Sequence, residues 1–222
     1  MKFLTVLICV IPAVSALAQE TPANWTGKYS TCERHEDLLS HEHLDIAVRI
    51  STANPVLAEQ FENALDFWSG ILDLDWHEVG VDAECSMQLV DGTPSLFDWC
   101  VCMSARAQLP DRGNFQGWIA FNPRFKLSKD AMFLDSVHEI GHVLGLAHNP
   151  DESSIMSAFG DEEKSARLDS ADLHELAVRH TLRPGIPGAG GRASVVVRRP
   201  HRVAENNRRG FQAAFRSVAT NF

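Results

Sequence analysis

One eleven-residue stretch, HEIGHVLGLAH at residues 138–148, constrains this chain more than any other part of the sequence. His138 and His142 are four residues apart, so on an α-helix their imidazoles lie on one face about one turn apart. Two imidazoles placed in this way can bind one metal ion. Glu139 is next to the first histidine, where a carboxylate can act as general base for a water molecule at the metal. The stretch therefore predicts a metal-bearing helix with its own base.

The second half of the stretch supplies a third ligand. Gly145 follows His142 by three residues, at a point where helices often end in a left-handed residue that glycine adopts at little cost. The chain can turn there and bring His148 back to the metal. Three protein ligands leave one tetrahedral position for water, which is the pattern of a catalytic zinc ion, Zn²⁺. The alternative is an amphipathic helix whose histidines face solvent, but fixed residue types at this spacing rarely match by accident.

These residues resemble the metzincin metalloproteases, whose consensus is HExxHxxGxxH. Met156 lies eight residues after His148 and is similar to the methionine of the Met-turn, which forms an apolar floor under the zinc in that family. Without that spacing, Met156 would be interpreted as core filling. The resemblance implies a zinc endopeptidase that hydrolyses peptide bonds in an extended protein substrate. The rival hypothesis is a zinc-binding effector without turnover, and the intact Glu139 argues against it.

The subfamily stays open. Astacins and serralysins carry a tyrosine two residues after the Met-turn methionine, whereas this chain has Ala158 there and its only tyrosine is Tyr29. Asn149 follows the third histidine, where adamalysins have aspartate and many matrixins have serine. We find no segment like the matrixin latency peptide and no match to a second, structural zinc site. Cys32 as an inhibitory zinc thiolate is an alternative, and calcium is possible without a specific loop pattern.

The N-terminus has the features of an export signal. Residues 1–18 contain a lysine, an apolar run and an Ala-x-Ala site before Gln19, so we expect cleavage there and a secreted, extracellular protein. The apolar run is too short to span a bilayer, and no later stretch is long enough. We interpret residues 19–40 as a polar N-terminal segment, in which Asn24 is a candidate glycosylation site.

Four cysteines remain after the signal is removed, an even number that predicts two disulfides in an oxidising compartment. Cys100 and Cys102 are too close in sequence to pair comfortably with each other. Each is expected to pair with Cys32 or Cys85, and the sequence does not choose between the two connectivities.

Hydrophobic periodicity and 45% apolar content place one folded catalytic domain over residues 41–182. The predicted elements are a strand at 44–50, a helix at 55–71, strands at 73–80, 86–90 and 117–122, the metal-bearing helix at 134–144 and a final helix at 168–182. This order is similar to that of matrixin-type catalytic domains. It implies an α/β (α+β) fold with a twisted, mixed, mostly parallel sheet, three main helices and an active-site cleft across the domain.

Two further assignments come from this resemblance. The strand at Gly117–Asn122 is expected to be the sheet edge against which an extended substrate pairs. Asp172, near the start of the final helix, either supports the Met-turn or caps the helix.

Residues 183–222 differ in composition from the rest of the chain, with eight arginines and a single acid. We expect a disordered basic tail that stays in solvent, binds an anionic surface, folds back, or is cut at a pair of arginines. Nucleic-acid binding is not expected, because no aromatic side chains alternate with these arginines. The protein is expected to be a monomer.

Overall fold

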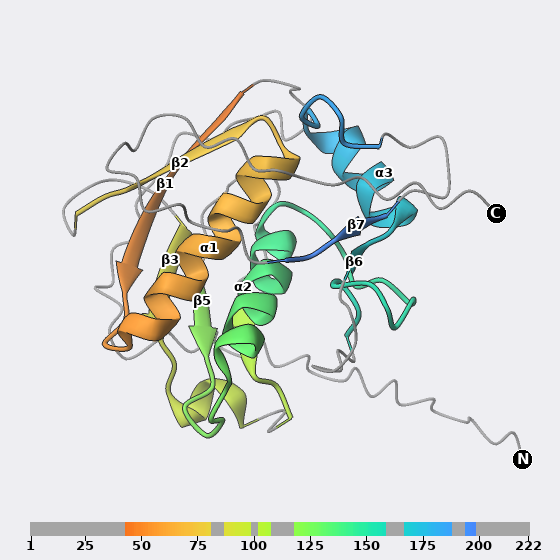
Figure 1. Ribbon diagram of the computed structural model, residues 1–222. Coiled ribbons are helices and arrows are strands. Elements are labelled where there is room, and N and C mark those ends of the chain that lie inside the picture. The colour runs from red at the N-terminus through yellow and green to blue at the C-terminus, as the bar shows by residue number, and fades with distance from the viewer. Residues whose placement is uncertain are drawn as a thin grey trace, which may run out of the picture.

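The computed structural model describes residues 43–80, 87–98, 102–107, 118–158, 167–187 and 194–198. Its centre is a five-stranded sheet with the strand order β2-β1-β3-β5-β4 (Figure 1). Neighbouring strands are parallel except for β4 and β5, which are antiparallel. The predicted α/β fold with a mixed, mostly parallel sheet is therefore confirmed. The strands are β1 (Leu44–Ser51), β2 (Leu74–Glu78), β3 (Met87–Asp91), β4 (Ala105–Ala107) and β5 (Trp118–Phe121).

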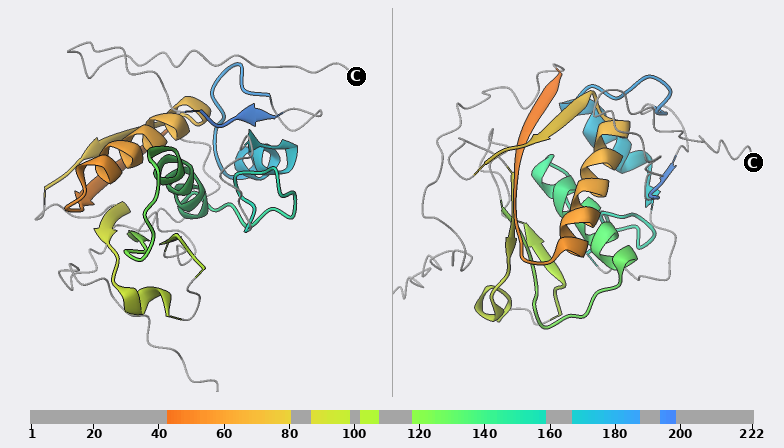
Figure 2. Two further views of the ribbon diagram at one scale, coloured as in Figure 1. Left: turned by 60° about the horizontal axis from the view of Figure 1, so that its bottom comes forward. Right: turned by 60° about the vertical axis from the view of Figure 1, so that its left-hand side comes forward.

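Two long helices pack against each other on one face of the sheet (Figure 2). They are α1 (Pro55–Ile71), with the predicted bounds, and α2 (Lys129–Val143). Each begins at a polar N-cap, because the side chains of Asn54 and Ser128 accept hydrogen bonds from the first free amides of their helices. α2 starts earlier than its apolar pattern predicted, since Ser128 sets its beginning.

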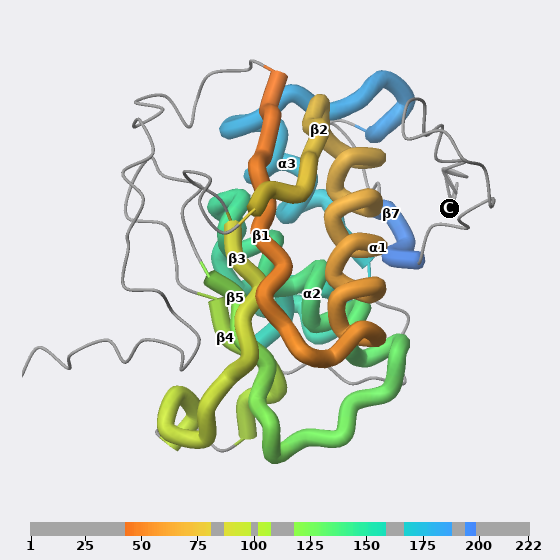
Figure 3. Tube along the Cα trace, turned by 90° about the vertical axis from the view of Figure 1, so that its left-hand side faces the viewer, coloured from red at the N-terminus to blue at the C-terminus, as the bar shows by residue number. Residues whose placement is uncertain are grey.

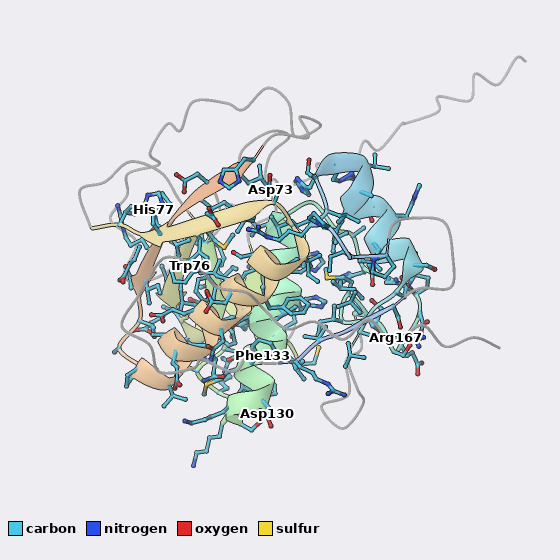
Figure 4. The ribbon with its side chains drawn as sticks, turned by 45° about the horizontal axis from the view of Figure 1, so that its top comes forward. Asp73, Trp76, His77, Asp130, Phe133 and Arg167 are labelled. Atoms are coloured by element: carbon cyan, nitrogen blue, oxygen red, sulfur yellow. The ribbon has the colours of Figure 1, made fainter. Side chains whose placement is uncertain are left out.

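Aromatic side chains hold α1 against α2. The rings of Phe67 on α1 and Phe133 on α2 meet edge to face with centroids 6.5 Å apart, and Figure 4 labels Phe133 on the side of α2 that faces α1. Trp68, fully buried, donates from Nε1 to the carbonyl of Val137 at 3.1 Å. This bond satisfies the indole N–H in the core and fixes α2 one residue before the first histidine.

The sheet edge differs from the sequence-based prediction. We expected residues 117–122 to form the edge, but β5 lies between β3 and β4, and β4 is the outer strand (Figure 3). β4 has only three residues, Ala-Arg-Ala, and follows a short helical turn, η1 (Pro94–Phe97). A segment this short shows no alternating pattern, so it was not predicted as a strand. The prediction that 117–122 is the edge is wrong.

The last helix and a small two-stranded sheet complete the domain. α3 spans Ser170–Arg179, shorter at both ends than predicted. β6 (Arg167–Leu168) pairs antiparallel with β7 (Val195–Val196), a strand that lies within the predicted tail.

The predicted domain boundary at residue 182 is also wrong. The Arg183 amide donates to the carbonyl of Ile71 at 2.9 Å, and its guanidinium donates to the carbonyls of Ser69 and Leu74. Further on, Val195 and Val197 are buried in the main hydrophobic core. Segments 183–187 and 194–198 thus belong to the folded domain. The remainder of the predicted tail lies outside the described residues.

Several predictions fall outside the described part of the chain, among them the signal at 1–18, the segment 19–40, Asn24 and three cysteines: Cys32, Cys85 and Cys100. Cys102 is described, and it is disulfide-bonded. The connectivity stays a prediction. Among the described residues, the helices are all too short or too polar to cross a membrane.

The C-terminal strand should contribute measurably to stability. Val195→Ala and Val197→Ala should each lower the free energy of unfolding by about 1–2 kcal/mol, because each removes buried methyl groups from the core. Val196→Ala is the matched control, since Val196 on the same strand is 38% exposed and should change stability little. Denaturant titration measures all three. Equal small effects at the three positions would show that β7 is not part of the core.

Candidate metal centre

The three histidines of the HEIGHVLGLAH stretch meet at one point. His142 Nε2 lies 3.0 Å from His138 Nε2 and 3.2 Å from His148 Nε2. Nitrogens bound to a tetrahedral zinc ion at about 2.0–2.1 Å would lie about 3.3 Å apart, so the observed spacing fits a shared ion. Among the described residues, no other group of His, Cys, Asp and Glu has this convergence. His148 is exposed and marks the open side of the centre.

Backbone carbonyls fix the orientation of two of these imidazoles. His138 Nδ1 donates to the carbonyl of Ile155 at 2.6 Å, and His142 Nδ1 donates to that of Leu146 at 2.8 Å. A proton held on Nδ1 leaves the Nε2 lone pair free to bind a metal. Both contacts join α2 to residues that follow it in the chain. The ring positions therefore depend on the course of the chain after the helix.

Burial keeps the same two imidazoles neutral. It lowers the pKa of His138 to about 4, helped by repulsion from His142. Burial also lowers the pKa of His142. A metal ion binds neutral imidazole, so these shifts favour metal binding near neutral pH without competition from protons.

Glu139 lies beside the three imidazoles and is only 7% exposed. The pKa of this carboxyl is raised to about 8, mainly by burial and secondly by the nearby charge of Asp135. A backbone hydrogen bond from Ala107 on β4 lowers the pKa of Glu139, and a bound cation would lower it as well. A carboxyl group poised near neutral pH can both accept and return a proton.

The turn at Gly145 takes the form that the sequence predicted. Gly145 has φ +97°, its amide donates to the His142 carbonyl at 3.0 Å, and the Leu146 amide donates to the Gly141 carbonyl at 2.9 Å. This pair of bonds is a Schellman motif, which ends α2 and reverses the chain. The reversal carries His148 back towards the two helical histidines.

Met156 is fully buried beneath α2. A Cβ added at Gly141 would lie 2.6 Å from the Met156 sulfur, so no larger residue fits there without displacement. The Asn149 amide donates to the Met156 carbonyl at 2.8 Å, which links this methionine to the residue after His148. Met156 therefore packs against α2 between the two helical histidines, and its role as an apolar floor under the metal stays a prediction. Sequence reasoning missed Gly141, although its place between the two helical histidines was a signal.

The N-terminal end of α3 supports this loop. Asp172 accepts hydrogen bonds from the side chains of Asn149 at 2.9 Å and Ser154 at 2.7 Å. It also accepts from the backbone of Asp169, the helix N-cap, in a capping box. Both interpretations of Asp172 left open by the sequence, a helix cap and a support for the Met-turn, therefore hold.

The C-terminal end of α3 holds the start of the same loop. His180 is buried and donates from Nε2 to the carbonyl of Leu144 at 2.8 Å. Arg179 donates from Nε to the carbonyl of Gly145 at 3.3 Å and packs over that glycine. The segment 144–149, which carries the third histidine, is thus anchored to α3 at both ends. We call the contacts of Asp172, Arg179 and His180 with this segment the α3 brace. No sequence pattern indicated this role for His180 or Arg179.

The described surface histidines have a different setting. His43 lies 3.2 Å from Asp73, and His77 lies 2.9 Å from Asp45. All of these side chains are at least 41% exposed. Figure 4 shows Asp73 and His77 along β2, away from α2. They form exposed polar contacts of the kind that contribute little to stability.

Comparison with known proteins agrees with this geometry. A matrixin family model matches residues 40–178. Matrix metalloproteinase-26 of Homo sapiens is 36% identical over a stretch covering 51% of this chain and 47% of that protein. Matrix metalloproteinase-16 of Homo sapiens is 28% identical, covering 61% of this chain and 26% of the relative. Metalloendoproteinase 1-MMP of Arabidopsis thaliana is 31% identical over a stretch covering 43% of this chain and 30% of that protein.

The chain spans less than half the length of each of these relatives. Matrixins use a catalytic zinc ion, and the three convergent imidazoles are able to hold one. The matched region contains the whole sheet, α1, α2 and the metal centre. The chain therefore belongs to the matrixin family.

Proposed function

We propose that the protein is a zinc-dependent endopeptidase in which His138, His142 and His148 bind the metal and Glu139 is the general base and acid. The observation that carries the proposal is the convergence of three Nε2 atoms beside a buried carboxylate. A structural zinc site has four protein ligands, whereas this group has three and an exposed side at His148.

The proposed chemistry divides between metal and protein. When bound, zinc acts as a Lewis acid that acidifies water and polarises the carbonyl of the scissile bond. Glu139 accepts a proton from the attacking water and delivers it to the nitrogen of the leaving amine. Its hydrogen bond from Ala107 holds the carboxylate at the border between α2 and β4. The reaction needs no covalent intermediate with a side chain of the protein.

The substrate main chain is proposed to pair with β4. This strand ends the sheet within the described residues, and Ala107 in it contacts Glu139. An extended peptide added to this edge would lie across α2 beside the metal centre, with main-chain hydrogen bonds holding it in register. β4 thus takes the role that the sequence had assigned to residues 117–122.

A zinc-binding protein without turnover is the competing function. Such a protein needs the three imidazoles but has no use for a buried carboxylate beside them, because burying that group without a role is unfavourable. The position of Glu139 therefore favours the enzyme.

Cleavage of unfolded casein tests the enzyme. Glu139→Ala should lower kcat/KM by at least about 10²-fold while zinc stays bound, because proton transfer is lost and the ligands remain. A chelator should abolish cleavage by the wild type. Glu78→Ala, an exposed change on β2, is the control and should cleave like the wild type. Equal cleavage by Glu139→Ala and wild type would refute the mechanism, and an inactive wild type with bound zinc would favour the binding protein.

Metal affinity tests the ligands together with the α3 brace. The protein should bind one zinc ion, and His142→Ala should abolish tight binding. His180→Ala should weaken binding by about tenfold, because the loop that carries His148 loses its anchor at Leu144. His174→Ala on the same helix is the control, since His174 is exposed. Chelator competition measures all four proteins. Unchanged affinity in His180→Ala would show that the brace does not position the third ligand.

We also propose that the protein is exported after cleavage behind Ala18. The features of residues 1–18 support this, as does the disulfide at Cys102, which suits an oxidising compartment. Protein recovered from the culture medium of an expressing cell should begin at Gln19 on N-terminal sequencing. Recovery only inside the cell with residues 1–18 attached would contradict export.

A further inference from the structure

We infer that the C-terminal strand β7 positions the first metal ligand, His138, through a relay of backbone hydrogen bonds. The inference rests on the metal ligands of the proposed function. β7 lies after residues 40–178, the region that the matrixin family model matches. The relay would therefore give a segment outside the matched region a part in metal binding, in addition to its place in the core.

The relay begins at the backbone of Ile155. The carbonyl of this residue accepts the 2.6 Å hydrogen bond from His138 Nδ1 that orients the imidazole. The amide of the same residue donates to the carbonyl of Arg167 on β6 at 2.7 Å. Ile155 is thus bonded to the ligand through one backbone group and to β6 through the other. A displacement of β6 would move the acceptor that orients the ring of His138.

α3 gives the same residue a second support. The Ser154 hydroxyl accepts a hydrogen bond from the Met156 amide at 2.9 Å and donates to Asp172 at 2.7 Å. The Met156 amide and the Ile155 carbonyl belong to one planar peptide unit, so α3 helps to fix the carbonyl that binds His138. The bond to β6 fixes the preceding peptide unit. Loss of the support from β6 should therefore weaken the orientation of the ring without abolishing it.

β6 is held in turn by β7, which lies beside it (Figure 1). The two antiparallel strands pair Arg167 with Val196 and Leu168 with Val195. Opposed residues in such a pair alternate between those that exchange backbone hydrogen bonds and those that do not. The Arg167 carbonyl is directed to Ile155, on the other side of β6. Leu168 and Val195 are therefore the pair that exchanges hydrogen bonds, and the Val196 amide faces away from β6.

The side chains of β7 and of the residue after it fix this segment independently of β6. Val195 and Val197 are 9% and 7% exposed and belong to the main hydrophobic core, whereas Val196 between them is 38% exposed. This alternation is that of a strand with one face on the core. Two strands of two residues would be marginal on their own, but dense packing restrains β7. β7 can therefore serve as a fixed support for β6.

Two substitutions at one position separate positioning from packing. Val195→Pro removes the amide that bonds to Leu168, whereas Val195→Ala keeps this amide and removes buried methyl groups. In the full-length protein, Val195→Pro should weaken zinc affinity by about tenfold, because His138 loses part of its outer support. Val195→Ala should bind zinc like the wild type, although its stability is lower. Chelator competition without denaturant measures both affinities.

Val196→Pro is the matched control, because it places the same residue type where the amide faces away from β6 and the side chain is exposed. It should keep the wild-type affinity for zinc. Replacement of zinc by Co²⁺ gives a second measurement, since the visible absorption of bound cobalt depends on the geometry of its ligands. Val195→Pro should change this spectrum, whereas Val195→Ala and Val196→Pro should leave it unchanged.

If Val195→Pro fails to fold, amide hydrogen exchange in the wild type decides. Coupling between two sites is reciprocal, so bound zinc should slow the exchange of the Val195 amide. The Val79 amide is the control, because it donates to the carbonyl of Val48 at 2.8 Å at the end of the sheet where β2 lies. The relay predicts that zinc slows exchange more at Val195 than at Val79. Equal changes at the two amides would contradict it.

The possible failures are distinct. A wild type that neither binds zinc nor cleaves casein contradicts the proposed function itself. A wild type that does both, together with a Val195→Pro variant of unchanged zinc affinity and cobalt spectrum, contradicts the role of β7 alone. Equal losses of affinity in Val195→Pro, Val195→Ala and Val196→Pro would also overturn the relay, because they would show that packing alone sets the affinity.

Discussion

The reversal of the chain after α2 is the constraint on which the metal centre depends. Helical geometry alone brings His138 and His142 together, whereas His148 meets them only if the backbone turns back within a few residues. The Schellman motif at Gly145 provides the turn, and a residue with a Cβ would be strained at φ +97°. A turn by itself leaves the loop free to move. The α3 brace removes this freedom at both ends of the loop, through Leu144 and Asn149.

This arrangement makes the centre a part of the hydrophobic core. Met156 packs against Gly141 between the two helical ligands, and Trp68 of α1 is also within contact distance of that glycine. Trp68 in turn donates to the carbonyl of Val137, directly before the first ligand. Cores are packed too densely for such contacts to shift independently. The spacing of the imidazoles is therefore set by the packing of α1 on α2 as much as by the ligands themselves.

Whether a feature could be predicted from the sequence depends on how close together in the chain its residues lie. The ligands, Glu139, Gly145 and Met156 could be predicted because fixed spacing along the chain encodes their chemistry. β4 and the α3 brace were missed because their partners are distant in sequence, and a three-residue strand has no period to detect. The C-terminal strand was missed for a different reason. The valines at 195–197 are a β-strand signal, but the arginine-rich composition around them favoured a disordered tail.

The same geometry divides the contacts of the proposed reaction into two kinds. Backbone pairing along β4 depends on no side chain of the substrate and would hold many sequences equally well. His138, Glu139 and His142 on α2 are different, because the proposed reaction needs the chemistry of their side chains at fixed heights along the helix. The proposed turnover would therefore be lost if any of the three were replaced.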